Sequence, residues 1–309
     1  MVAREVSVVE DRLLAARDLH GVTVEVAAED PRLLAAALRE LPPHPAGPAP
    51  PAIRLRLGAR PIPPPPAPLR QGALGLDYLQ RYPGVWLRTR SGTLFHADLR
   101  AGWGQVEIAA RHWDAAGPEL HSGFVLLLRY LLREAGLYSL HASGVTLGAS
   151  AVLLAGPGGS GKSTTAALLA RGGAGLLADD LLLLREDPGG IRALPFEVPL
   201  ALHRDVLDRV AARAVPGAAA PWARAGAHPR LLLFPRVGPG EETRARPLPR
   251  AEALRRLIAC SFLLGGRETA AEHLRLLAAL ARQVRSFDLL LGRDFEALPG
   301  LVRSLLARA

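Results

Sequence analysis

The stretch "GPGGSGKSTT", residues 156–165, decides the fold of this chain. Gly156, Gly161, Lys162 and Ser163 match the pattern G-x-x-x-x-G-K-[ST] in full. In that pattern the glycines let successive backbone N–H groups wrap a phosphate, and the following helix directs its positive N-terminal end at the same anion. The lysine reaches the β and γ phosphates, and the next hydroxyl is placed to bind Mg²⁺. The stretch therefore predicts binding of ATP with Mg²⁺.

Lys162 is the only lysine in the chain. The sequence holds 38 Lys and Arg residues together, and every other one is arginine. A planar guanidinium is bulkier than an ammonium and cannot thread beside the phosphates, so this is the one position where arginine would fail. The residues expected to bind the nucleotide are Gly156, Gly158, Gly159, Ser160, Gly161, Lys162, Ser163 and Thr164.

Composition narrows the classes of function. The net charge is +9, but the arginines are scattered and form no basic stripe interleaved with aromatic residues, which argues against nucleic acid as a partner. The single cysteine, Cys260, excludes an internal disulfide and fits a reducing compartment. The charged start "MVAREVSVVEDR" is unlike a signal peptide, and glycines and a proline interrupt the uncharged run 142–161. We therefore expect a cytoplasmic protein with no membrane partner.

Residues 1–115 are expected to form a small α+β module. Strand-like alternation in 21–30 leads into a helix with Asp30 as its N-cap, and a hairpin turns at Ser91 and Gly92. We interpret two proline-rich runs, 42–51 and 61–68, as stiff connectors. The alternative is that they are peptide ligands that dock in the aromatic groove of another domain.

Residues 116–309 are expected to form an α/β domain with a mixed sheet flanked by helices. A helix over 118–136 precedes two strand-like runs, and a short helix follows the glycine loop. Further strands and helices alternate to the end of the chain, with helices expected near 251–264 and 268–284.

Two further features point to chemistry. The motif "LADD" places Asp179 17 residues after Lys162, with one short helix between them, so the paired aspartates should lie at the end of a neighbouring strand. Adjacent carboxylates repel unless a cation or a proton uses them. His141 lies in a run expected to enter the sheet, where a histidine more often packs than reacts. The sequence has no asparagine, which excludes the Asn-Lys-x-Asp guanine motif and the catalytic-loop Asn of eukaryotic-type protein kinases.

Together "SLHASGV", the glycine loop and "LLADDLLLL" resemble the catalytic domain of HPr kinase/phosphorylase and its relatives over roughly residues 120–210. The resemblance implies a P-loop kinase domain akin to phosphoenolpyruvate carboxykinase, which transfers the γ-phosphate of ATP to a serine-type hydroxyl of a peptide, protein or small molecule. It implies Asp179 as the base, His141 beside it as a tuning group and Lys162 at the phosphates. It also implies Ser163 as a Mg²⁺ ligand, with Asp180 holding the metal directly or through water.

The chain departs from that family downstream of the aspartates. The family's Glu-Ile-Arg-Gly-Leu-Gly signature is missing from "ALPFEVPLALHRDV", residues 193–206, so we expect a kinase without phosphorylase activity. Glu197 is either a second metal ligand or a strand-edge carboxylate. The alternatives are an ATP-binding switch or slow ATPase without an acceptor, and a P-loop kinase of a small metabolite. The identity of the acceptor and homo-oligomer formation stay open.

Overall fold

The computed structural model describes residues 7–9, 12–72, 76–108, 117–197, 222–238, 240, 242–261 and 267–309. Contacts divide the chain into unit 1, Met1–Leu137 with Leu264–Thr269, and unit 2, Tyr138–Leu263 with Ala270–Ala309. This division falls after residue 137 and not after the expected residue 115.

Helix α2 (Gly117–Glu134) explains the later boundary. Its apolar face packs on unit 1, where Gly123 meets the ring of Phe95, and Leu127 and Leu131 lie against Gly104. A helix that we assigned to the second domain therefore belongs to the core of the first.

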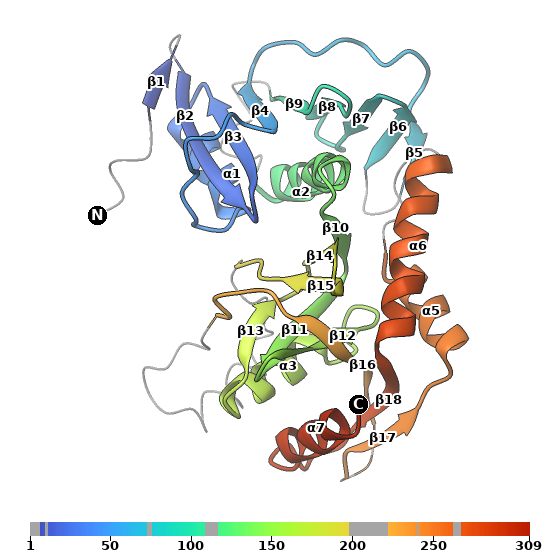
Figure 1. The fold of residues 1–309 in the computed structure, drawn as a ribbon. Coiled ribbons are helices and arrows are strands. Elements are labelled where there is room, and N and C mark those ends of the chain that lie inside the picture. Colours follow the sequence, from blue (N-terminus) through green and yellow to red (C-terminus); the bar gives the residue numbers. More distant parts are fainter. Residues whose placement is uncertain are drawn as a thin grey trace. The chain divides into compact units, whose positions relative to one another are not determined.

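Unit 1 is larger than the small module expected from the sequence. Its nine-stranded sheet has the order β1-β2-β3-β4-β9-β8-β7-β6-β5, and Figure 1 shows α1 and α2 beside it. Strands are β1 (Ser7–Val9), β2 (Arg12–Leu19), β3 (Val22–Ala28), β4 (Ile53–Gly58), β5 (Arg70–Gln71), β6 (Asp77–Arg81), β7 (Gly84–Arg88), β8 (Leu94–Asp98) and β9 (Trp103–Glu107).

Local signals in unit 1 act as predicted. Helix α1 (Pro31–Arg39) begins after Asp30, whose carboxylate accepts the N–H of Arg32 at 2.7 Å. The turn at residues 91–92 joins β7 to β8. Within the second proline-rich run, the carbonyl of Pro63 accepts the indole N–H of Trp86 at 3.0 Å, so this connector is fixed to the sheet of its own unit.

Unit 2 is built on a mixed sheet, as the sequence predicts. Its six-stranded sheet has the order β13-β11-β12-β16-β18-β17, in which β12, β16 and β18 are parallel and β11 and β17 run against their neighbours; a second sheet has the order β10-β14-β15. Strands are β10 (Tyr138–Leu140), β11 (Ala142–Leu147), β12 (Ser150–Ala155), β13 (Gly175–Ala178), β14 (Leu182–Asp187), β15 (Gly190–Leu194), β16 (His228–Val237), β17 (Arg244–Pro247) and β18 (Arg285–Leu291). Helices are α3 (Lys162–Arg171), α5 (Arg250–Ala259), α6 (Arg267–Gln283) and α7 (Leu298–Ala307).

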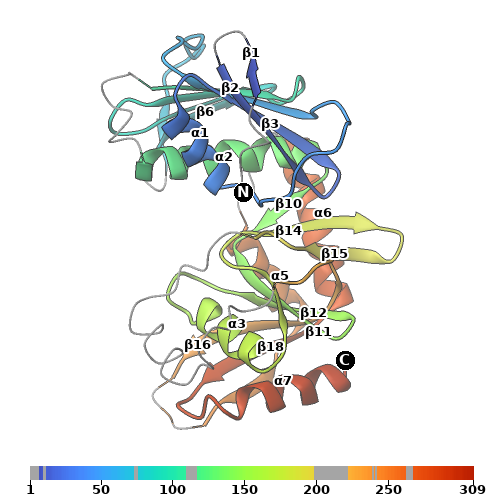
Figure 2. The ribbon, with the colours of Figure 1, turned by 90° about the vertical axis from the view of Figure 1, so that its left-hand side faces the viewer.

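Helices cover both faces of the six-stranded sheet. On one face α3 and α7 close a core that includes Leu154, Leu233 and Leu289 (Figure 2). Side chains alternate along a strand, so Phe234 and Asp288 face the other side, where Arg256 of α5 lies over the Phe234 ring and pairs with Asp288 at 3.1 Å. No helix among the described residues is long and apolar enough to cross a membrane.

Candidate functional site

Sheet pairing in unit 2 brings the candidate residues to one edge. Strand β11 runs antiparallel to both neighbours, pairing Ala142 with Ala155 of β12 and Gly144 with Ala178 of β13. The start of β11 therefore lies beside the ends of β12 and β13. His141 directly precedes the start of β11, the glycine loop follows the end of β12, and the two aspartates follow the end of β13.

Two sequence expectations need correction here. The aspartates do not follow the strand next to that of the glycine loop, because β11 lies between β12 and β13. His141 is also not inside a strand: it occupies the bend between β10 of the small sheet and β11 of the large one. Its backbone N–H donates to the carbonyl of Cys260 at 3.0 Å, which fixes this bend.

The loop between β12 and α3 has the backbone that the glycine pattern requires. Gly159 and Gly161 have φ values of 74° and 101°, which side-chain-bearing residues rarely adopt, and a Cβ on Gly161 would lie 2.6 Å from Leu291 Cδ1. The Ser160 hydroxyl in the loop is buried without a hydrogen-bond partner. An unpaired buried hydroxyl in a glycine-rich loop can donate to an anionic oxygen.

Lys162 is folded back into this loop and is only 5% exposed. Its Nζ donates to the carbonyls of Gly156 and Pro157, both at 3.0 Å, and lies 3.2 Å from His141 Nε2. Burial lowers the pKa of Lys162 from its ordinary value, and the nearby Asp180, Cys260 and Asp179 oppose that shift.

Asp180 pairs with His141. The Nδ1 atom of His141 lies 2.9 Å from Asp180 Oδ1 and 3.1 Å from the Asp180 carbonyl. Because Lys162 supplies a donor to Nε2, a neutral imidazole with its proton on Nδ1 satisfies all of these contacts. The Asp180 backbone has a φ of 67°, and its side chain is 63% exposed.

Asp179 points inward and is 5% exposed. Its Oδ1 accepts the Ser143 hydroxyl at 2.5 Å and the Ser163 hydroxyl at 2.8 Å, while Oδ2 is buried without a hydrogen-bond partner. This pairing differs from the expected one. Ser163 contacts Asp179 and not Asp180, and His141 contacts Asp180 and not Asp179.

The side chains at this edge suit Mg²⁺ held together with phosphates. Mg²⁺ is bound through oxygen atoms, commonly one or two carboxylates plus phosphate and water oxygens. Ser163 and the unpartnered Oδ2 of Asp179 are such donors, and the exposed carboxylate of Asp180 is a third. In the described part of the chain, no group of three or more His, Cys, Asp and Glu residues could hold a metal ion by itself.

Glu197 directly follows Phe196, which pairs with the end of β13. Phe196 bridges to Ala178 in parallel, and its N–H donates to the carbonyl of Leu177 at 2.7 Å. The described chain stops at Glu197 in this region, so most of residues 193–206, which lack the family signature, lie outside the described residues.

Known proteins give little further guidance. No family model matches the sequence, and no curated protein matches it. A structure search finds the Hpr(Ser) kinase/phosphatase from Coxiella burnetii. That match has 14% identity over 55% of this chain and 94% of that chain, with a TM-score of 0.28. A TM-score of 0.28 is too low to assign a shared fold, so the functional assignment rests on the residues of this chain.

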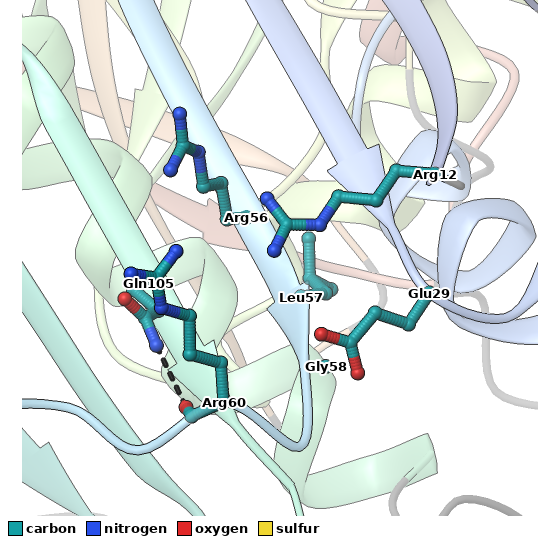
Figure 3. Close-up of a pocket in the computed structure, with 7 residues that line it drawn as sticks. All are labelled: Arg12, Glu29, Arg56, Leu57, Gly58, Arg60 and Gln105. Atoms are coloured by element: carbon teal, nitrogen blue, oxygen red, sulfur yellow. Dashed lines mark hydrogen bonds between the residues drawn. The ribbon is translucent and has the colours of Figure 1, made fainter. Parts of the chain in front are cut away.

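A hollow lies wholly within unit 1 (Figure 3). It is lined by Arg12, Glu29, Arg56, Leu57, Gly58, Arg60 and Gln105. Glu29 is fixed over Gly58, where its Oε2 accepts the N–H of Ala59 at 2.8 Å. The lining carries three guanidinium groups and one carboxylate but none of the predicted site residues, so we place the candidate chemistry at the glycine loop.

Sequence reasoning missed Ser143 and Cys260. The fold brings both residues to the site, Ser143 from β11 and Cys260 from the end of α5. Burial raises the pKa of the Cys260 thiol, and the Gly156 N–H and Lys162 oppose that shift. A buried serine in an apolar strand is the one signal that could have drawn attention to Ser143.

Proposed function

We propose that this chain is an ATP- and Mg²⁺-dependent kinase that transfers the γ-phosphate to a serine-type hydroxyl of a peptide, protein or small molecule. The observation that carries the proposal is the convergence of Lys162, Ser163 and Asp179 at the end of the glycine loop, with one carboxylate oxygen of Asp179 left without a partner. Phosphoryl transfer needs charge neutralisation, positioning and a group that orients the nucleophile, and these residues can supply all three.

Bound Mg·ATP would supply the transferable phosphoryl group. The backbone N–H groups of residues 158–164 would hold its phosphates, and Lys162 would exchange its two carbonyl partners for phosphate oxygens. Ser163 would turn its hydroxyl oxygen from Asp179 to the metal, assisted by Asp180. Asp179 would then accept the proton of the acceptor hydroxyl at Oδ2.

One contact favours a second assignment of the carboxylates. Ser163 and Asp179 already lie 2.8 Å apart, the arrangement expected if both bind the same Mg²⁺. In that case Asp179 is a metal ligand, and Asp180 with His141 orients the acceptor. The Asp179→Asn variant separates the two assignments, because only the metal-ligand role requires Asp179 for Mg·ATP affinity.

The test of the proposal is transfer from γ-labelled ATP to a lysate and to candidate serine peptides, followed by mass spectrometry of the labelled product. Lys162→Ala is the matched control, because it should abolish both transfer and hydrolysis. Label released only as phosphate, with no labelled acceptor, would favour the switch or slow-ATPase alternative.

Phosphorylase activity is expected to be missing, because the chain lacks the downstream signature that this activity requires in the resembling family. Incubation of phosphorylated acceptor with excess phosphate should release no unmodified acceptor. Release of acceptor together with pyrophosphate would contradict this part of the proposal.

A further inference from the structure

Ser143 is a polar residue in an apolar setting. It lies on β11 between Ala142 and Gly144, and its exposed fraction is 0%. A buried hydroxyl costs free energy unless it is hydrogen-bonded, and an alanine would fill the same position without that cost. The Ser143 hydroxyl donates a hydrogen bond to Asp179 Oδ1 at 2.5 Å.

The two oxygens of Asp179 are made unequal by this contact. Oδ1 accepts hydrogen bonds from Ser143 and Ser163, whereas Oδ2 accepts none and is buried. Rotation about the terminal torsion of an aspartate side chain has a low barrier, and its two oxygens are nearly equivalent. Hydrogen bonds therefore decide the orientation of each oxygen. The donors come from different elements, Ser143 from β11 and Ser163 from the start of α3.

The two donors have different fates when Mg·ATP binds. If Ser163 binds the metal, as the proposed function requires, its oxygen coordinates the cation, and its O–H is no longer committed to Asp179 alone. The Ser143 hydroxyl donates to Asp179 Oδ1 and not to the glycine loop, so this bond is kept when the loop binds phosphate. It then remains the donor that orients the carboxylate.

We propose that Ser143 is a positioning residue, which fixes Oδ1 of Asp179 so that Oδ2 is presented to the phosphate site. This inference rests on the proposed function for its effect on turnover, but the orientation of the carboxylate can be measured without any transfer. A hydrogen bond to a charged group contributes about 1.5–3 kcal/mol, so its loss corresponds to about a 10- to 100-fold fall in kcat.

The kinetic test compares Ser143→Ala with wild type. We expect kcat to fall about 10- to 100-fold while the KM for ATP changes less than about twofold, because Ser143 acts on Asp179 and not on the nucleotide. Ser143→Thr, which retains a hydroxyl, should recover most of the lost kcat. Thr146→Val is the matched control, because it removes a hydroxyl from the same strand that bonds only the Gly175 carbonyl, at 3.3 Å, and should keep wild-type kcat.

Unchanged kcat in Ser143→Ala would overturn the proposal, as would an equal loss in Thr146→Val or a rise in the KM for ATP as large as the loss of kcat. If Ser143→Ala does not fold, Ser143→Cys replaces the hydroxyl by a thiol of similar size and a weaker donor. A folded Ser143→Cys variant should lose kcat about 10-fold or more, and wild-type turnover in it would also overturn the proposal.

The second readout needs no phosphate acceptor. The protein is prepared with aspartate labelled at the side-chain carboxyl carbon, and infrared spectra are recorded with Mg·ADP bound. The carboxylate band of Asp179 is identified as the band that is missing from the spectrum of Asp179→Asn. This band should shift in Ser143→Ala and not in Thr146→Val. Failure of wild type to phosphorylate anything would refute the proposed function alone, whereas an unshifted band would refute the role of Ser143 alone.

Discussion

Replacing the sole lysine by arginine is the sharpest perturbation of the candidate site. Lys162 Nζ has two carbonyls at 3.0 Å and His141 Nε2 at 3.2 Å around it, and the side chain is 5% exposed. A guanidinium has the same charge but a broader planar head, which cannot take the place of a compact ammonium among these three contacts. Lys162→Arg therefore tests shape while conserving charge.

The expected loss follows from the misplaced positive charge. One charge-assisted hydrogen bond to phosphate contributes about 1.5–3 kcal/mol, so the Mg·ATP affinity of Lys162→Arg should fall about 10- to 150-fold. Lys162→Ala should lose more, because two charge-assisted hydrogen bonds to phosphates at about 1.5–3 kcal/mol each correspond to about 10²- to 10⁴-fold. Titration calorimetry with Mg·ATP measures both affinities.

The matched control is Arg171→Lys, the reverse exchange on the same helix. Arg171 lies at the far end of α3 and pairs with Glu296 at 2.8 Å near the surface, so this variant should bind Mg·ATP like wild type. Wild-type affinity and turnover in Lys162→Arg would refute the explanation given for the single lysine.

Three further outcomes are expected. Asp179→Asn should keep Mg·ATP affinity and lower transfer by about 10²–10⁴-fold, as removal of a general base does, and a calorimetric loss of affinity would instead make Asp179 a metal ligand. His141→Asn removes the contacts to Lys162 and Asp180 and should lower transfer, whereas wild-type transfer with a lower melting temperature would leave His141 a packing residue. Cys260 should lower the stability of the wild type at high pH, and Cys260→Ala should remove this effect. In the unfolded chain the thiol loses its proton near its ordinary pKa of 9.0, whereas burial raises the pKa of the folded thiol above that value. The free energy of unfolding of the wild type therefore falls as pH rises through this window. Denaturant titrations of both proteins from pH 8 to pH 10 measure this difference, and parallel curves would contradict it.

Local patterns predicted the parts of the fold and of the candidate site that depend on neighbouring residues in the chain. The glycine spacing specified a loop before α3, and Asp30 with Pro31 specified the start of α1, because each signal lies within a few consecutive residues. The turn between β7 and β8 was likewise encoded where it occurs.

Contacts between distant elements were not encoded in this way. The pairing of Ser163 with Asp179, and of His141 with Asp180, depends on β11 lying between β12 and β13, an order that no single strand specifies. The apolar face of α2 likewise shows that the helix is covered but not by which unit. The roles of the two aspartates were therefore beyond what spacing could decide.

Transfer of label from ATP to a serine hydroxyl decides whether this chain is a kinase. Wild type and Asp179→Asn are incubated with γ-labelled ATP, Mg²⁺ and serine-containing acceptors, and the label on each acceptor is located by mass spectrometry. We predict phosphoserine in the wild-type reaction and about 10²- to 10⁴-fold less in Asp179→Asn. Wild-type hydrolysis of ATP without any labelled hydroxyl, or equal labelling by the two proteins, would contradict the account.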